Sequence, residues 1–298
     1  MKLYSPATIA DIKQRYDFRL SRSLGQNFIT DRSVIQRIIE GCGAGENDLV
    51  IEIGPGIGVL TSAAAEVAAH VTAVEIDSKL IPILGETLAG YTNIDIVNRD
   101  ILKTDLNRII EERRSAGDFT GDAVLIGNLP YYITTPIIMK ILENNVNVRS
   151  ITIMMQKEVA DRIKASPGGR IYGALSVAVQ YYCEVEQVAK VPKEVFVPRP
   201  KVDSAVLRLT LREKKPVELY DEKIFFACIK GGFGQRRKTL LNSLTGVMGM
   251  SKDDVREVLT STGIDHSRRA ETLDIKEFAA IANRVAALTL NREKINEG

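Results

Sequence analysis

The sequence predicts an α/β protein with a doubly wound, mostly parallel sheet, followed by a small all-helical domain. Two observations carry this prediction. Short apolar runs alternate with helix-length segments from about residue 48 onward, and the pattern becomes helical throughout after about residue 217. Such alternation is typical of parallel strands joined through crossover helices. We therefore predict a first domain over residues 1–216 and a second, all-α domain over residues 217–298.

Five buried parallel strands are expected in the first domain. They are DLVIEI (residues 48–53), VTAVEI (71–76), IDIV (94–97), AVLIGN (123–128) and SITIMMQ (150–156). A helix that ends near Tyr182 then leads to VEQVAKV and SAVLRLTLR, which a proline-containing loop joins. Two late strands so close together are expected to form an antiparallel edge. The polar stretch that follows, REKKPVELYDEK, marks the predicted domain boundary.

The composition narrows the possible chemistry. With 298 residues, 45% of them hydrophobic and 26% charged, the chain has a globular composition. Cys42, Cys183 and Cys228 lie far apart without a C-x-x-C spacing, which argues against a disulfide framework and a zinc site. Only His70 and His266 are available for a metal centre or a Ser-His-Asp triad. We therefore expect no bound metal.

Neither a signal peptide nor a membrane helix is expected. The chain does not start with a basic, alanine-ended leader, and its most apolar long stretch, residues 59–74, is interrupted by Glu66 and His70. We expect a cytoplasmic protein that is a monomer and does not bind a membrane.

A glycine-rich turn follows the first predicted strand, in EIGPGIG. Gly54, Gly56 and Gly58 let the backbone approach a ligand and let the next helix start close to the sheet. The G-x-G-x-G spacing differs from the G-x-G-x-x-G of dinucleotide enzymes, so a pyrophosphate site is the weaker interpretation. Taken alone, the turn is also consistent with any α/β fold.

Two acidic residues follow the next two predicted strands. Glu75 lies about 20 positions after Gly54, where such folds place a carboxylate that binds the ribose hydroxyls. Asp100 would lie beside the same crevice and could accept a hydrogen bond from an adenine amino group, while Ile101 packs on the ring. Each acid alone is more often a helix cap. Together with the glycine turn, they predict an adenosine site without a required phosphate.

The stretch IGNLPYYITTP ends the fourth predicted strand and should face the same crevice. Nothing in a packed core requires an amide, a rigid ring and an aromatic side chain in the order Asn128, Leu129, Pro130 and Tyr131. One interpretation of this stretch is therefore a functional site. The alternative is an ordinary turn with two half-buried tyrosines.

Seven motifs in order cover most of the chain: SLGQNFITD, EIGPGIG, VEID, RDIL, GNLPYYITTP, MMQKEVADRI and VFVPRPKVDSAV. They resemble the class I S-adenosylmethionine-dependent methyltransferases. Specifically, they resemble the ribosomal RNA adenine-N6 dimethyltransferase family, whose members dimethylate two adjacent adenosines near the 3′ end of small-subunit rRNA. The resemblance implies a Rossmann-like, seven-stranded sheet, S-adenosyl-L-methionine as methyl donor, and small-subunit rRNA in an immature 30S-type subunit as partner.

The resemblance also assigns site residues. For the cofactor these are Asn27, Ile29, Gly54, Gly56, Glu75, Ile76, Asp100, Ile101 and Asn128. In that reaction the Asn128 side-chain oxygen and the Leu129 carbonyl can both accept hydrogen bonds from the adenine amino group, while Pro130 fixes the turn and Tyr131 can stack on the base. We expect direct in-line attack of adenine N6 on the sulfonium methyl group without a strong general base. Phe196 could form the second face of a base sandwich, although a core role is equally consistent. The family's usual Leu is Ile29 here, and Tyr132 stands where Asn is common, which leaves the outer pocket wall open.

RNA binding is expected from basic segments. Between residues 223 and 238 the chain has five basic residues and no acid, ending in Arg236, Arg237 and Lys238. Such runs usually cover a solvated face, but beside a catalytic motif they indicate phosphate contacts. Because neighbours on a helix are about 100° apart, these three residues cannot share one helix face. Two other functions remain open: a large-subunit rRNA adenine methyltransferase of the antibiotic-resistance type, and a non-catalytic ribosome-assembly or transcription factor.

Overall fold

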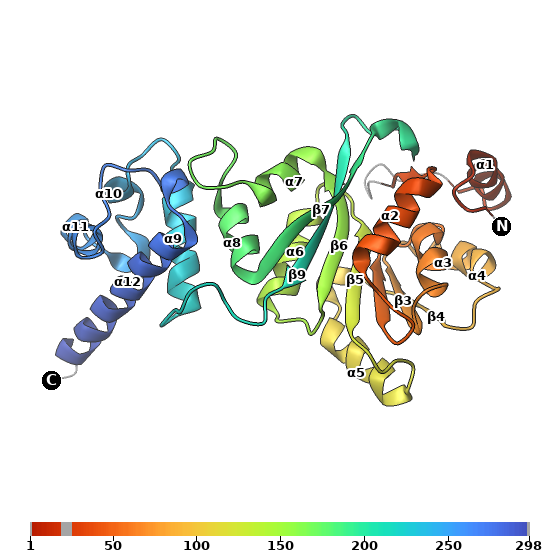
Figure 1. Ribbon diagram of the computed structural model, residues 1–298, viewed down its shortest axis with the longest axis horizontal. Helices are drawn as coiled ribbons and strands as arrows, with labels where there is room; N and C mark the ends of the chain where they lie inside the picture. Colours follow the sequence, from red (N-terminus) through yellow and green to blue (C-terminus); the bar gives the residue numbers. More distant parts are fainter. Residues whose placement is uncertain (1, 19–25, 297–298) are drawn as a thin grey trace. The chain divides into compact units, whose positions relative to one another are not determined.

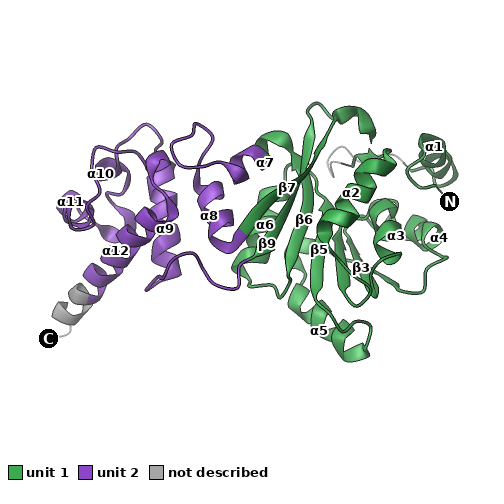
Figure 2. Cartoon of the chain, in the orientation of Figure 1, with its two compact units in different colours: residues 1–160, 184–211 green, residues 161–183, 212–298 purple. Residues whose placement is uncertain are grey.

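The computed structural model describes residues 2–18 and 26–296, with side chains up to Leu290 (Figure 1). The chain forms two compact units (Figure 2). Unit 1 contains residues 1–160 and 184–211, and unit 2 contains residues 161–183 and 212–298.

Unit 1 is built on a seven-stranded sheet with the strand order β4-β3-β2-β5-β6-β9-β7. Its strands are β2 (Leu49–Ile53), β3 (His70–Glu75), β4 (Ile94–Asn98), β5 (Ala123–Asn128), β6 (Ser150–Gln156), β7 (Cys183–Val191) and β9 (Ser204–Leu211). The first five pair in parallel, and β9 runs antiparallel to β6. The predicted fold class, the five parallel strands and the antiparallel edge are therefore confirmed.

Helices precede, connect and follow the parallel strands of unit 1. They are α1 (Pro6–Arg15), α2 (Arg32–Cys42), α3 (Val59–Ala65), α4 (Ile81–Thr87), the 3-10 turn η1 (Ile101–Lys103), α5 (Leu106–Ala116), α6 (Thr134–Glu143) and the start of α7 (Lys157–Lys164). Apolar residues alternate between the two faces of each strand. Val50, Val124 and Met154 belong to the core that packs against α2, α3 and α4, while Ile51 and Leu125 are buried on the opposite face.

A second, two-stranded sheet was not predicted. Strands β1 (Phe28–Ile29) and β8 (Phe196–Val197) pair antiparallel, with Ile29 opposite Phe196, and the short turn η2 (Lys193–Val195) precedes β8. Such short strands lack the periodic pattern on which sequence prediction depends. The pair joins segments that are far apart in the sequence. Thr30 strengthens the pairing, since its backbone N–H and its hydroxyl both donate to the Val195 carbonyl, at 2.8 and 2.9 Å.

Unit 2 is helical in its described part. It contains the end of α7, then α8 (Ala174–Tyr182), α9 (Glu222–Gly234), α10 (Leu240–Ser243), η3 (Val247–Gly249), α11 (Lys252–Ser261), η4 (Ala270–Thr272) and α12 (Ile275–Asn296). The compact units separate at Leu211, near the predicted boundary, but residues 161–183 join the C-terminal helices. The reason is aromatic packing: Tyr182 stacks on Phe226 with ring centroids 5.7 Å apart, and Tyr181 contacts Phe225 at 5.1 Å.

The last three residues of the basic run do not lie on a helix. Arg236, Arg237 and Lys238 are exposed in the turn between α9 and α10, so the helix-face argument made from the sequence was wrong. Gly234 and Gln235 end α9 just before these three residues.

Within the described residues, every helix is too short or too polar to cross a membrane.

Candidate active site

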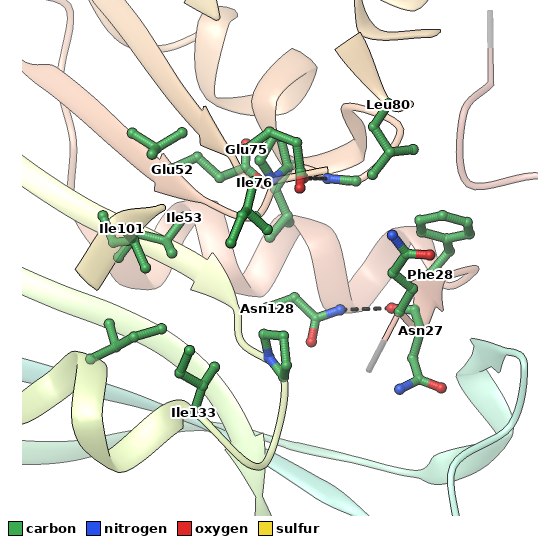
Figure 3. A pocket seen from close by; sticks show the side chains of 18 of the residues that line it. Asn27, Phe28, Glu52, Ile53, Glu75, Ile76, Leu80, Ile101, Asn128 and Ile133 are labelled. Carbon is green, nitrogen blue, oxygen red and sulfur yellow. Dashed lines mark hydrogen bonds between the residues drawn. The ribbon is translucent and has the colours of Figure 1, made fainter. Parts of the chain in front are cut away.

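A pocket lies at the carboxyl ends of β2, β3, β4 and β5, where the chain leaves the sheet (Figure 3). It holds about 950 Å³ of space, part of it open to solvent. Predicted site residues that line it are Asn27, Ile29, Gly54, Gly56, Glu75, Ile76, Asp100, Ile101, Asn128 and Pro130. The order of these parallel strands in the sheet therefore brings together residues from Gly54 to Pro130, which are 76 positions apart.

The glycine turn forms one wall of the pocket. Gly54, Gly56 and Gly58 all have positive φ angles, of 70°, 61° and 88°, which other residues adopt only at a cost. A Cβ atom at Gly56 would lie 2.9 Å from the ring of Phe28. Glycine at this position therefore allows the turn and the N-terminal segment to approach each other closely.

Glu75 is buried at the end of β3, with 4% of its surface exposed. Its Oε1 accepts a hydrogen bond from the Asp77 backbone N–H at 2.8 Å, and Oε2 accepts from that of Gly56 at 3.4 Å. Burial raises the pKa of Glu75, and the two N–H donors partly offset this effect. Each carboxylate oxygen can accept more than one hydrogen bond, so the group keeps acceptor capacity for a ligand.

Asp100 and two isoleucines also line the pocket. Asp100 caps η1 by accepting the Leu102 N–H at 2.9 Å, and Ile101, which follows it, is 8% exposed. Ile76 also lines the pocket but is 53% exposed, unusually high for an isoleucine. An exposed aliphatic side chain at the rim offers a surface on which a flat ring can pack.

Residues 26–30, here called the N-terminal strap, border the pocket. Gln26 Nε2 donates to Asp77 Oδ2 at 3.0 Å, next to the Glu75 turn. The Asn27 carbonyl accepts from Asn128 Nδ2 at 2.8 Å (Figure 3). The strap therefore links the turn after β3 with the loop after β5. Residues 23–25 of the same motif lie outside the described part of the chain.

Residues 128–132, at the end of β5 and in the loop that follows, differ in whether they line the pocket or lie in the core. Asn128 and Pro130 line the pocket, whereas Leu129 is only 1% exposed and can act only through its backbone. Tyr131 is half-buried, and its hydroxyl hydrogen-bonds with Ser204 Oγ at 2.8 Å. Tyr132 is the tyrosine that lines the pocket, with 61% exposed.

Several predicted RNA-contact residues lie elsewhere. Phe196 is buried in the β1–β8 pair, 3% exposed, and contributes to the core of unit 1. Arg236, Arg237 and Lys238 belong to unit 2, where Arg236 donates to the Arg170 carbonyl at 2.6 Å. The structure thus groups the cofactor-type residues in one pocket, while the basic run belongs to the other unit.

Sequence reasoning placed Gln26 and Phe28, in the GQNF segment, over the methionine end of the cofactor, and both line the pocket. It assigned no role to several others that line it: Glu52, Leu80, Arg99, Ile133 and Ile137. Most are apolar residues at the ends of elements, which carry no pattern distinct from core residues. Glu52 is the notable case, because it is 1% exposed and accepts a hydrogen bond from the Thr61 hydroxyl. Burial raises its pKa to about 8, partly offset by that hydroxyl. Its position as an acidic residue inside a predicted buried strand was the feature of the sequence that could have identified it.

One group of potential metal ligands exists among the described residues, and it lies away from the pocket. His70, Asp95 and Asp118 bring ligand atoms close together. However, the Arg113 guanidinium forms ion pairs with both Asp95 and Asp118. The position that a cation would take is therefore used by arginine.

Comparison with known proteins gives a consistent result. A family model described as Ribosomal RNA adenine dimethylase matches residues 17–287. The chain is 51% identical over 287 residues to the ribosomal RNA small subunit methyltransferase A of Alkaliphilus oremlandii, covering 96% of this chain and 98% of that protein. It is 48% identical over 282 residues to the protein of the same name from Clostridioides difficile, covering 95% and 96%.

Solved structures agree. A dimethyladenosine transferase from Plasmodium falciparum has a TM-score of 0.69 at 25% identity, over 85% of this chain and 95% of that one. The 23S rRNA methyltransferase ErmE has a TM-score of 0.65 at 27% identity, over 87% and 99%. With a family model along most of its length and full-length relatives that share about half of its residues, the chain belongs to the ribosomal RNA adenine dimethylase family.

Proposed function

We propose that this protein transfers methyl groups from S-adenosyl-L-methionine to N6 of two adjacent adenosines near the 3′ end of small-subunit rRNA. The product is N6,N6-dimethyladenosine, formed during ribosome biogenesis. One observation carries the proposal: a buried carboxylate suited to a ribose and an oriented amide suited to an adenine amino group line the same pocket.

The pocket residues suit the proposed cofactor. Glu75 would accept hydrogen bonds from the ribose hydroxyls, and Asp100 would accept from the adenine amino group, with Ile76 and Ile101 beside the ring. The glycine turn and the strap, through Asn27, would border the methionine end. The bound cofactor supplies an electrophilic methyl group on a sulfonium centre.

Asn128 is the residue proposed to orient the reacting amine. Its Nδ2 is already held by the Asn27 carbonyl, which directs Oδ1 to the other side of the amide. Oδ1 and the Leu129 carbonyl can accept from the two N6 hydrogens and so orient the nitrogen lone pair. A neutral amide binds the amine without first removing its proton. Fixed dipoles of this kind favour the developing positive charge on nitrogen.

Stacking on the target base is assigned to the tyrosines of the same loop. Tyr131 is tethered to Ser204 through its hydroxyl, so its ring has a fixed position from which it could stack. Tyr132 is exposed at the pocket and could contact the base or a neighbouring nucleotide. Phe196 would need to leave its buried position before it could cover the second face of the base.

Unit 2, together with the predicted 217–298 domain that it contains, is proposed to position the RNA. Arg236, Arg237 and Lys238 present three exposed positive charges in one turn. If they contact phosphates, changing all three to Glu should weaken rRNA binding and flatten its salt dependence by about 0.7 to 0.9 per lost contact. Cofactor affinity should stay unchanged. An unchanged salt slope would exclude this turn from the RNA surface.

Small-subunit rRNA is favoured over the large subunit because the relatives near 50% identity carry small-subunit names, whereas the 23S enzyme is 27% identical. The protein is proposed to act as a cytoplasmic monomer on immature 30S-type subunits. A ribosome-assembly factor without catalysis would bind the same particle but leave no methyl groups.

The direct test uses labelled S-adenosylmethionine with three substrates: unmethylated small subunits, naked small-subunit rRNA and large subunits. We expect N6,N6-dimethyladenosine near the 3′ end of the RNA in small subunits. Label in large-subunit rRNA would contradict the choice of substrate. Binding to small subunits without label would indicate an assembly factor.

A further inference from the structure

The 3-10 turn η1 is fastened to helix α6 by the side chain of Lys140. Its ammonium donates to the carbonyl of Ile101 at 3.0 Å and to that of Thr104 at 2.8 Å. These two carbonyls flank the turn that carries Asp100 and Ile101 into the pocket. Lys140 itself does not line the cofactor-type pocket, so it acts on that wall from behind.

The turn keeps its own shape through short-range hydrogen bonds. It is three residues long, and 3-10 hydrogen bonds are weaker than those of an α-helix. The Thr104 hydroxyl donates to the Asp100 carbonyl at 2.8 Å, and the Lys103 N–H donates to the same carbonyl at 2.9 Å. These contacts fix Asp100 relative to the turn, whereas Lys140 fixes the turn relative to the rest of unit 1.

Helix α6 also supports the loop that carries Asn128. It begins directly after that loop, and the hydroxyl of Thr134, 1% exposed, donates to the Pro130 carbonyl at 3.1 Å. Ile137 lines the pocket and precedes Lys140 by three positions, so the two residues share one helix face. One helix therefore holds both the proposed reaction loop and the proposed adenine wall.

Taking the proposed cofactor site as given, we propose that Lys140 is a positioning residue for purine recognition. It holds Asp100 and Ile101 where they meet the six-membered ring of the cofactor's adenine. In this way it sets the preference of the site for a 6-amino over a 6-oxo purine.

The chemistry of selection follows from Asp100. An ionised carboxylate only accepts hydrogen bonds, so it pairs with a 6-amino group and is repelled by a 6-oxo group. This discrimination depends on the carboxylate being held at one place, since a mobile turn could move Asp100 away from the oxo group. Loss of Lys140 should therefore lower the preference of the site for the 6-amino ligand while the protein stays folded.

The test compares S-adenosylhomocysteine with S-inosylhomocysteine by calorimetry on the full-length protein. Lys140→Met keeps the aliphatic stem and removes the donors. We expect the ratio of the two affinities to fall by about fivefold or more, the scale of one lost hydrogen bond. Lys140→Arg keeps donors and should retain most of the ratio. Lys103→Met removes an exposed lysine from the same turn and should leave the ratio unchanged.

A double-mutant cycle checks that Lys140 acts through Asp100. In an Asp100→Ala background, Lys140→Met should change the ratio little, because the selecting carboxylate is already absent. Lys140→Leu, which also lacks donors, is the second variant if Lys140→Met does not fold, and it should also lower the ratio. A wild-type ratio in either folded variant, or an equal loss of both ligands, would overturn the proposal. Failure of the wild type to bind S-adenosylhomocysteine would instead overturn the cofactor site on which it rests.

Discussion

Buried carboxyl groups have different partners at the two ends of the parallel strands. At the amino ends, Asp48 just before β2 has a side chain 9% exposed and accepts from the Arg149 guanidinium at 2.9 Å. Arg149 also pairs with Asp122 at 2.8 Å. At the carboxyl ends, Glu52 and Glu75 are equally buried, yet within the described residues they accept only from a hydroxyl and from backbone N–H groups.

The pKa values follow this difference. Burial alone would raise the pKa of Asp48, but the N–H groups of Gly45 and Asp122 and the Arg149 guanidinium lower it. For Glu52 and Glu75, burial dominates and the pKa is raised. At the amino ends the buried carboxylate is thus paired with a cation, whereas at the carboxyl ends the buried carboxyl groups keep acceptors that a ligand could use. We infer that one end stabilises the fold and the other serves the reaction.

The largest expected effect comes from Asn128→Ala at the carboxyl ends. Single-turnover methyl transfer should fall by roughly a hundredfold or more, the scale for losing one preorganised polar contact in a transition state. The melting temperature and much of the cofactor affinity should be retained. Rapid-quench measurement with labelled S-adenosylmethionine gives the rate.

Asn93→Ala is the matched control at the amino ends. Asn93 precedes β4, and its Nδ2 donates to the carbonyls of Ala65 and Ala68 at 3.0 and 3.2 Å. This variant should lower the melting temperature and leave the single-turnover rate close to normal. If Asn128→Ala kept near-normal turnover, or lost mainly cofactor binding, its proposed role would be wrong.

Glu75→Ala should weaken S-adenosylmethionine binding at least tenfold. It removes acceptors for two hydroxyls, and a hydrogen bond to a charged group contributes about 1.5 to 3 kcal/mol. Calorimetry measures the affinity, and Asp122→Ala makes the same charge change at the opposite ends of the strands. Unchanged affinity in a folded Glu75→Ala protein would remove this residue from the site, and NAD binding by the wild type would revive the dinucleotide alternative.

The same contrast explains what could be predicted from the sequence. The strands were found because buried parallel strands are continuous apolar runs, and their ends then placed Glu75, Asp100 and Asn128 at one edge. Tertiary contacts could not be predicted, because no local pattern encodes them. The hydrogen bond from Asn128 to Asn27 joins residues 101 positions apart, and the β1–β8 pair is too short to show periodicity.

The directions of side chains were the other gap. Consecutive residues of a loop point in different directions, so the motif NLPYY did not reveal that Tyr132 lines the pocket while Tyr131 binds Ser204. Similarly, a run of basic residues after a predicted helix was taken as helical, although glycine and glutamine end α9 before it. Local composition thus located the functional segments but did not fix the orientation of each residue.

Arg149→Met tests the amino ends directly. The variant should lower the free energy of unfolding by about 1 to 2 kcal/mol, because the buried Asp48 carboxylate loses its ionic partner. The loss is smaller than for a fully buried ion pair because Arg149 is partly exposed to solvent. Urea denaturation measures the change. Cofactor affinity at the other end of the strands should stay within twofold of the wild type. A matched loss of affinity would show that the two ends are coupled.

Glu52→Gln should give an effect that is small at pH 5 and grows as the pH rises. Because the pKa of Glu52 in the folded protein is about 8, against 4.5 ordinarily, the folded state binds a proton more tightly than the unfolded state. The stability that this group contributes is therefore complete below about pH 4.5 and is lost as the pH rises to about 8. Gln does not titrate and keeps an acceptor for the Thr61 hydroxyl.

The variant should therefore melt close to the wild type at pH 5 and higher than it at pH 8. The difference between these two pKa values corresponds to a gain of the order of a few kcal/mol at pH 8, which is a rise of roughly 5 to 10 °C in a protein of this size. Thermal denaturation across this pH range measures the difference, and Glu52→Ala, which leaves Thr61 without its acceptor, should be destabilised at every pH. A difference between Glu52→Gln and wild type that stays constant with pH would mean that Glu52 is ionised in the folded protein. A cationic partner would then have to lie beside it, and the contrast between the two ends of the strands would not hold at this residue.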